Sequence, residues 1–159
     1  MKLYGFVILL MAGNQASLSV KDARDQYFRS SDAGPEAAKF EQMLEPVKEN
    51  DNPVLVAYKG AAEMLKAKTV SSPIGKMTCF NKGKKLIEAA ILRDSLNMES
   101  RFIRYSIQVN LPGFLDYKKN IASDRTLVER SMDTLSDIEF KNKITAFLKD
   151  PKARISKAH

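Results

Sequence analysis

Residues 97–108 read NMESRFIRYSIQ, and this stretch predicts the helix around which the rest of the fold is arranged. At roughly 100° per residue its apolar side chains fall into two stripes on different sides of the helix. One stripe holds Met98, Phe102, Tyr105 and Val109, and the other holds Ile103 and Ile107. A helix with two apolar stripes contacts neighbours on two sides, so we expect it to be central.

Two cations lie between those stripes. Arg101 and Arg104 share one side of the helix with Asn97 and Gln108, and these four, with Lys59 as a candidate neighbour from an adjacent helix, form the predicted binding site. The functional interpretation is a groove that binds a carboxylate from a peptide terminus or an acidic side chain. The structural interpretation is bidentate pairing with carboxylates of adjacent helices. Candidates for that pairing are Glu63, Glu88 and Asp94.

Glu99 lies on the other side of this helix. It occupies the first turn after the predicted cap Asn97, where the helix dipole favours a negative charge. We therefore expect Glu99 to act locally, at the helix end.

The other segments also have helical periodicity, and their ends carry capping and proline signals. Five helices are predicted over residues 18–29, 35–44, 53–68, 97–111 and 114–122. Two more have a less sharply defined start, one that begins between residues 77 and 81 and ends at 93, and one that begins at 123 or 124 and ends at 132. A last one follows a predicted capping box at Ser136–Glu139. TVSSPIG (69–75) is predicted to be a loop, and Gly83 indicates either a close helix contact or a weak point. No segment alternates with a period of two, which predicts an all-α fold of antiparallel helix pairs.

Composition limits the chemistry. The chain has 159 residues with a net charge of +7, and its basic residues are spread along its length, which favours a solvated surface over a nucleic-acid site. Cys79 is the only cysteine and is expected to be a small buried residue, so no intramolecular disulfide is predicted. The only histidine is the last residue, His159, which argues against Ser–His, Cys–His and zinc–His chemistry. No metal and no cofactor are predicted.

The amino terminus MKLYGFVILLMAGNQASLS has the order of a secretory signal peptide, with one cation, a short apolar run and small polar residues. We expect a signal peptide over 1–16, a single helical domain over 17–150 and a basic flexible tail over 151–159. The apolar run is about half the length that a membrane-spanning helix needs. The predicted location is therefore the periplasm or the exterior, and the alternative is a buried first element of a cytosolic domain.

Three stretches carry a resemblance: AYKGAAEMLKAK (57–68), FNKGKKLIEAAI (80–91) and NMESRFIRYSIQVNLPGFLDYKKNI (97–121). Together they resemble small exported all-α proteins of Bacteroidota, and the pattern E-x-R-F-x-R-x-x-x-Q followed by P-x-F-L-x-Y is the most specific part. The resemblance implies a short tetratricopeptide-like array or an irregular bundle with an interaction role. It brings no catalytic residues.

These observations predict a non-enzymatic exported helical protein that binds a protein or peptide in the cell envelope. VSSPIGKM (70–77) lacks the first glycine and the final hydroxyl residue of a phosphate-binding loop, so nucleotide binding is not expected. Two alternatives stay open. One is a small hydrolase that uses acidic residues only, and the other is a cytosolic basic protein that binds nucleic acid.

Overall fold

The structure is a computed structural model that describes residues 17–30 and 34–150. The predicted signal peptide and the predicted basic tail lie outside these ranges. Within them the chain forms seven α-helices, two short 3-10 turns and no strand, which confirms the all-α prediction. The α-helices are α1 (Val20–Arg29), α2 (Pro35–Leu44), α3 (Pro53–Lys66), α4 (Pro73–Arg93), α5 (Met98–Asn110), α6 (Ile121–Ser131) and α7 (Ile138–Lys149).

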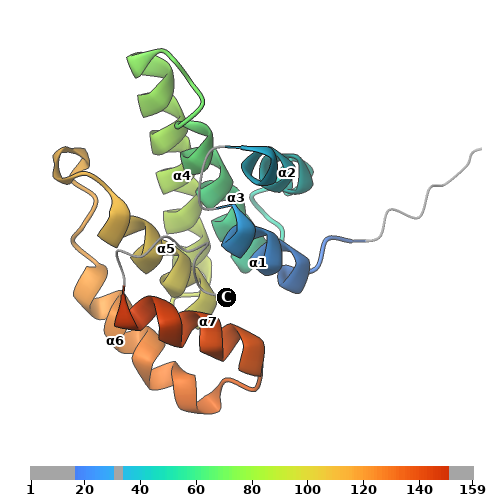
Figure 1. Cartoon of the computed structure of the whole chain (residues 1–159), viewed down its shortest axis with the longest axis vertical. Helices are drawn as coiled ribbons and strands as arrows, with labels where there is room; N and C mark the ends of the chain where they lie inside the picture. Colours follow the sequence, from blue (N-terminus) through green and yellow to red (C-terminus); the bar gives the residue numbers. More distant parts are fainter. Residues whose placement is uncertain (1–16, 31–33, 151–159) are drawn as a thin grey trace, which may run out of the picture.

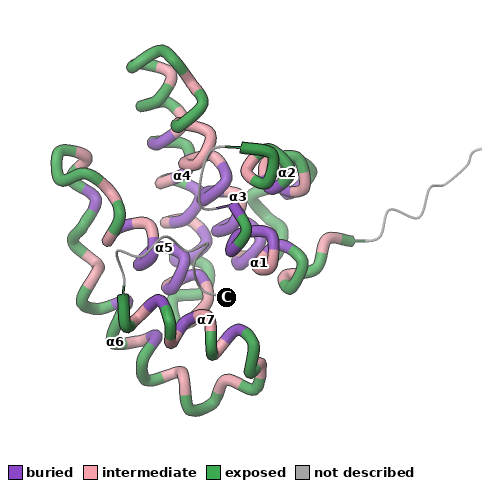
Figure 2. Tube along the Cα trace, viewed as in Figure 1, coloured by how far each residue is buried: buried purple, intermediate pink, exposed green. Residues whose placement is uncertain are grey.

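From α1 to α6 each helix contacts the next one in the chain, with α3 and α5 at the centre (Figure 1). α3 and α4 form the most extensive helix pair, α5 contacts both of them and α6, and α1 and α2 cover α3. Buried segments lie where α1, α3, α4 and α5 meet, whereas the upper end of α4 is exposed (Figure 2). None of the helices in the described ranges has the length and apolar character needed to cross a membrane.

Several helix ends lie where the sequence predicts them. Asn52 caps α3 by accepting a hydrogen bond from the Val54 amide at 2.9 Å, and Asn97 caps α5 through the Ser100 amide at 3.0 Å. α5 ends at Asn110, two residues before Pro112, as expected from the geometry that proline imposes on its predecessor. These ends were predictable because a cap involves residues no more than about four apart.

The start of α4 was predicted wrongly. α4 begins at Pro73, not between residues 77 and 81, and TVSSPIG is therefore only partly a loop. The Ser72 hydroxyl caps α4 by accepting a hydrogen bond from the Gly75 amide at 3.4 Å. Ser72-Pro73 thus combines a cap with proline at the first helical position, as Asn52-Pro53 does at the start of α3.

The predicted helix over 114–122 is also wrong. A single 3-10 turn, Gly113–Leu115, is followed by Asp116 in the left-handed region (φ 44°), and α6 starts only at Ile121. At the last helix, the capping residue is Asp137 and not Ser136, because the Asp137 carboxylate accepts the Phe140 amide hydrogen bond at 3.0 Å. The position three residues after this cap is Phe140, whose side chain cannot return a hydrogen bond, so the capping-box prediction is wrong.

The core is rich in aromatic rings, and Phe102 of α5 lies at its centre. Its ring centroid is 6.0 Å from those of Phe28 and Phe140 and 5.5 Å from that of Phe147, so α5 is joined to α1 and α7. The opposite stripe of α5 is buried as well, since Ile103 has no exposed surface. The prediction that α5 has apolar contacts on two sides is confirmed.

Gly60 and Gly83 bring the backbones of α3 and α4 into direct contact. A Cβ atom placed on Gly83 would lie 2.5 Å from the Gly60 carbonyl oxygen and 2.6 Å from Cγ of Met64. A Cβ atom on Gly60 would lie 2.6 Å from the Gly83 carbonyl oxygen. Because backbone atoms cannot move aside cheaply, Gly83 serves close packing and is not a weak point of the helix.

We predict that Gly83→Ala lowers the free energy of unfolding by about 1 to 3 kcal/mol, the usual cost of forcing extra volume into a packed contact. Gly113→Ala is the control, because no atom lies within 4 Å of a Cβ placed there. Urea unfolding of both variants measures the difference. A Gly83→Ala variant as stable as wild type would contradict the close contact.

Candidate functional site

Arg101 and Arg104 converge on one buried carboxylate. Asp124, in the first turn of α6, has no exposed surface. It accepts hydrogen bonds from Arg104 Nε at 2.7 Å, Arg104 Nη2 at 2.8 Å and Arg101 Nη1 at 2.7 Å. Three charge-assisted bonds replace the water that this carboxylate loses on burial. The two arginines therefore join α5 to α6.

Glu88 of α4 completes this cluster. Its carboxylate accepts a bond from Arg104 Nη1 at 2.7 Å and another from the Tyr117 hydroxyl at 2.6 Å. Two guanidinium groups now face two carboxylates, which balances the charge. We call Arg101, Arg104, Asp124, Glu88 and Tyr117 the Asp124 cluster. It links α4, α5, α6 and the α5–α6 loop.

Of the three pairing partners suggested by the sequence, only Glu88 belongs to the Asp124 cluster, and Glu63 and Asp94 do not. Glu63 pairs with Lys82, and Asp94 accepts a hydrogen bond from Asn97 at 3.1 Å. The main partner, Asp124, was missed because the sequence indicated it only as a possible first residue of a helix, whereas α6 begins at Ile121. Its position between Ile121 and Val128 on the inner face of α6 was the available signal.

Glu99 belongs to a second buried cluster, so the purely local role predicted for it is wrong. Arg24 of α1 binds the Glu99 carboxylate through Nε at 2.8 Å and Nη2 at 2.7 Å, and the Tyr58 hydroxyl donates to it at 2.6 Å. Arg24 Nη1 also reaches Asp137, the cap of α7, at 2.6 Å. The guanidinium lies 4.1 Å from the centre of the Phe140 ring. We call this group the Glu99 cluster, and it joins α1, α3, α5 and α7.

The other predicted site residues have separate positions. Asn97 caps α5. Gln108 has no exposed surface, and its amide atoms have no hydrogen-bond partner among the described residues. Lys59 does not join the arginines. Its Nζ donates to the Glu45 carbonyl at 2.9 Å and to the Val47 carbonyl, at the carboxyl end of α2. The fold thus brings together Arg101 and Arg104 but not the complete predicted set.

Burial and charge alter the ionisation of groups in both clusters. Burial alone would lower the pKa of Arg104, but its bonds to Asp124 and the charge of Glu88 outweigh that effect and raise it. Burial, reinforced by Glu88, raises the pKa of Tyr117, and burial with Glu99 raises that of Tyr58. The carboxylates in each cluster are held by a guanidinium rather than sharing a proton. This arrangement fastens helices and does not resemble an acid–base pair.

Two hollows lie outside the clusters. The first, of about 470 Å³, lies between α2, α3 and α4 and contains Lys59. Four of its lining residues form two ion pairs, Lys66 with Glu41 and Lys82 with Glu63. Because four of its six charged side chains pair with one another and Lys59 is bonded to backbone carbonyls, this hollow offers few free charges to an external ligand.

The second hollow is a groove of about 700 Å³ beside α6. It is lined by Leu96, Arg101, Ala122, Ser123, Thr126, Leu127, Arg130, Ser131 and Thr134, a set without a carboxylate. The hydroxyl groups of all four of its Ser and Thr residues, Ser123, Thr126, Ser131 and Thr134, donate to backbone carbonyls of the same region. The side-chain donors that remain for a ligand are therefore the two guanidinium groups. We call this hollow the α6 groove.

Arg101 lines the α6 groove as well as the Asp124 cluster. Its Nη1 binds Asp124 and its Nε donates to the Ser95 carbonyl at 2.9 Å, while Nη2 makes no hydrogen bond within the described residues. Arg130 is exposed and forms no ion pair in the same part of the chain. One predicted binding residue thus remains accessible, in a groove that the sequence did not reveal.

Cys79 is only partly buried, which differs from the expected buried position. In the described ranges no group of histidine, cysteine and acidic side chains is arranged to hold a metal ion. No known protein family, curated protein or solved structure matches the chain. The candidate site is therefore argued from geometry alone.

We predict that Arg104→Met destabilises the fold by about 3 to 5 kcal/mol, because Asp124 then loses two of its bonds while it remains buried. Adding Asp124→Leu to this variant should recover part of the loss. The control is Arg125→Met, which removes an exposed pair with Glu129 and should cost no more than about 0.5 kcal/mol. Equal losses for Arg104→Met and Arg125→Met in urea unfolding would contradict a structural Asp124 cluster.

We also predict that stability falls as the pH rises above about 10, the ordinary tyrosine pKa. Burial raises the pKa of Tyr27 to about 12, so the native state keeps a proton that the unfolded chain has already lost. Between the pKa of the unfolded chain and that of the native state, such a group lowers the free energy of unfolding by about 1.4 kcal/mol per pH unit. Urea unfolding from about pH 8 to about pH 11 measures the slope. Tyr58 and Tyr117, whose pKa values are also raised by burial, contribute to the slope in the same direction. Tyr27→Phe should therefore reduce the slope without abolishing it, and an unchanged slope would count against this assignment.

Proposed function

We propose that this chain is an exported, non-enzymatic helical protein that binds a carboxylate-bearing segment of another protein in the α6 groove. The observation that carries the proposal is that Arg101 and Arg130 line the same groove and that none of its lining residues is acidic. Guanidinium groups bind carboxylates through two parallel hydrogen bonds, which favours a peptide terminus or an acidic side chain.

The size and lining of the groove also support a peptide ligand. Its volume of about 700 Å³ lies in the range of ligand sites, roughly 300 to 1,000 Å³, and suits a few residues of peptide. Leu96 is 79% exposed at its edge and provides apolar contact area. Hydroxyl groups along α6 can still accept hydrogen bonds from peptide N–H groups.

Export is proposed from the amino-terminal sequence, which has the order of a signal peptide. A periplasmic or secreted location would expose the groove to other envelope or extracellular proteins. The resemblance to exported tetratricopeptide-like proteins supports the same interaction role. Sequencing the mature amino terminus from isolated cell fractions tests this part, and a mature chain that retains residues 1–16 would contradict it.

We predict that short fluorescent peptides of Asp, Glu and Leu with a free carboxyl terminus bind the full chain, and that Arg130→Glu weakens them at least about tenfold. This loss of affinity corresponds to the removal of one charge-assisted hydrogen bond between Arg130 and the peptide. Fluorescence anisotropy measures the affinity. Arg130 is exposed, so the substitution should leave the fold intact.

Arg125→Glu is the matched control, because Arg125 is on the same helix but does not line the groove. The same peptides with an amidated carboxyl terminus test the role of the terminal carboxylate. Binding that is insensitive to Arg130→Glu would contradict the α6 groove as the site. Loss of binding on Arg125→Glu alone would do so too.

A further inference from the structure

A long segment of the chain is basic throughout. Between Glu63 and Glu88 there is no acidic residue, and the segment covers the end of α3, the α3–α4 connection and most of α4. Its lysines are Lys66, Lys68, Lys76, Lys82, Lys84 and Lys85. Three of these lysines pair with glutamates outside the segment, Lys66 with Glu41, Lys82 with Glu63 and Lys85 with Glu49. Lys76, near the start of α4, has no such partner among the described residues.

This segment projects from the body of the protein. The α3–α4 connection and the first turns of α4 form the upper extremity of the molecule, and they are largely exposed (Figures 1 and 2). Ile74 is 81% exposed and Met77 is 43% exposed, with the exposed Lys76 between them. Large apolar side chains at the tip of a projecting hairpin cannot contribute to the core.

The α5–α6 loop lies beside this projection. Tyr117 anchors the loop, because its ring packs against Phe80 of α4 at 6.1 Å and its hydroxyl binds Glu88. Phe80 is six residues from Ile74, so the loop lies roughly 9 Å below the tip along α4. Both connections therefore belong to one end of the molecule, as Figure 1 also shows.

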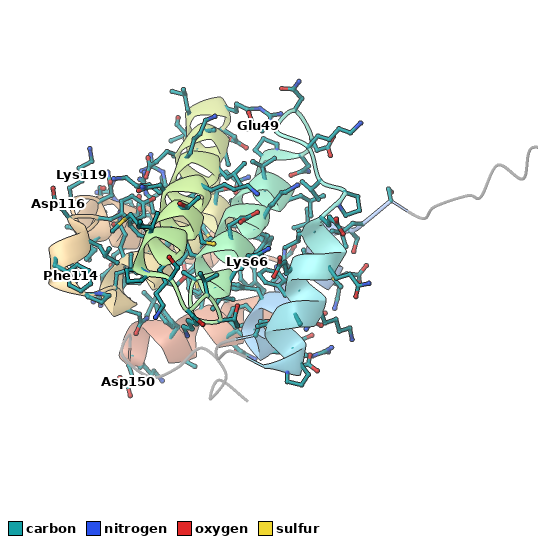
Figure 3. All side chains as sticks on the ribbon, turned by 90° about the horizontal axis from the view of Figure 1, so that it is seen from above. Glu49, Lys66, Phe114, Asp116, Lys119 and Asp150 are labelled. Atoms are coloured by element: carbon teal, nitrogen blue, oxygen red, sulfur yellow. The ribbon has the colours of Figure 1, made fainter. Side chains whose placement is uncertain are left out.

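Like the tip, the loop presents apolar and basic side chains, and it also carries one exposed acid, Asp116. Phe114 is 83% exposed, and Lys118 and Lys119 are exposed next to it. In Figure 3, which looks down on this end, the side chains of Phe114, Asp116 and Lys119 point away from the body. Lys76, Lys118 and Lys119 form no ion pair within the described part of the chain. We call Ile74, Lys76, Met77, Phe114, Lys118 and Lys119 the hairpin end.

We propose that the hairpin end docks on the surface of an anionic lipid membrane. Lysines near such a surface are attracted to lipid headgroups, and adjacent apolar side chains can enter the boundary between headgroups and acyl chains. The hairpin end offers both kinds of contact on two convex loops. This role is independent of peptide binding in the α6 groove, which is lined by other residues.

Lipid fits this surface better than nucleic acid does. Phosphate contacts would use the lysines but would leave Ile74 and Phe114 in water. A membrane surface accommodates cations and projecting apolar groups together and adapts to a convex shape. The charge and exposure of the hairpin end thus favour lipid over a phosphate backbone.

Co-sedimentation with vesicles tests the proposal on the full chain. We expect binding to vesicles of phosphatidylcholine mixed with phosphatidylglycerol, weaker binding to phosphatidylcholine alone, and a decrease with added salt. Lys76→Glu should weaken partition at least about fivefold, the effect of one lysine near the surface. Replacing Ile74 and Phe114 together by serine should weaken it about tenfold or more.

The matched controls lie at the other end of the same helices. Leu92 is 86% exposed near the end of α4, roughly 27 Å from Ile74 along the helix, so Leu92→Ser should bind like wild type. Lys48→Glu changes an exposed lysine just before α3 and should also bind like wild type. The amino-terminal apolar run is the same in every variant, so differences among them report on the hairpin end alone.

Three results would overturn the proposal. The first is equal binding of wild type and the hairpin-end variants to anionic vesicles, or no binding by any of them. The second is an equal loss in the Leu92→Ser control. The third is binding of a DNA duplex that falls with Lys76→Glu while the serine variant leaves vesicle binding unchanged, since that pattern would identify a nucleic-acid surface.

Discussion

The buried carboxylate of Asp124 sets the arrangement of α4, α5 and α6. A carboxylate without exposed surface is tolerated only where several donors replace water, and here Arg101 and Arg104 provide three bonds. Sliding α6 along α5 by one turn would remove these bonds and leave the charge unpaired. The cluster therefore contributes more to a unique helix register than to the net free energy of folding.

The Glu99 cluster has the same role on another side of α5. Arg24 and Glu99 are 75 residues apart in the chain, and Arg24 and Asp137 are 113 apart, so this group joins the first and last described helices to the central one. Each cluster contains a tyrosine hydroxyl that donates to a glutamate, Tyr58 to Glu99 and Tyr117 to Glu88. Removing either glutamate would therefore leave a buried hydroxyl without its partner, while the guanidinium would keep only its other carboxylate, Asp124 for Arg104 and Asp137 for Arg24.

The charged side chains of α5 are largely used in these clusters, so only Arg101 of this helix also faces a proposed binding surface. Arg101 takes part in both roles, since its Nη1 binds Asp124 and its side chain also lines the α6 groove. The hairpin end is a separate surface whose position depends on Tyr117, which holds the α5–α6 loop against α4. A protein built this way could hold a peptide in the α6 groove while its hairpin end rests on a lipid surface.

The sequence by itself determined the all-α class and several helix ends, among them the caps at Asn52 and Asn97, because these signals act between residues a few positions apart. It also identified Arg101 and Arg104 as an unusual pair on a central helix. It offered Glu88 as one of three candidate partners, but it did not single out Glu88 from the other two, and it did not reveal that Asp124 binds both arginines or that Glu99 binds Arg24. Only the tertiary structure decided those pairings, because they join residues 16 to 75 positions apart and depend on which helix faces pack together.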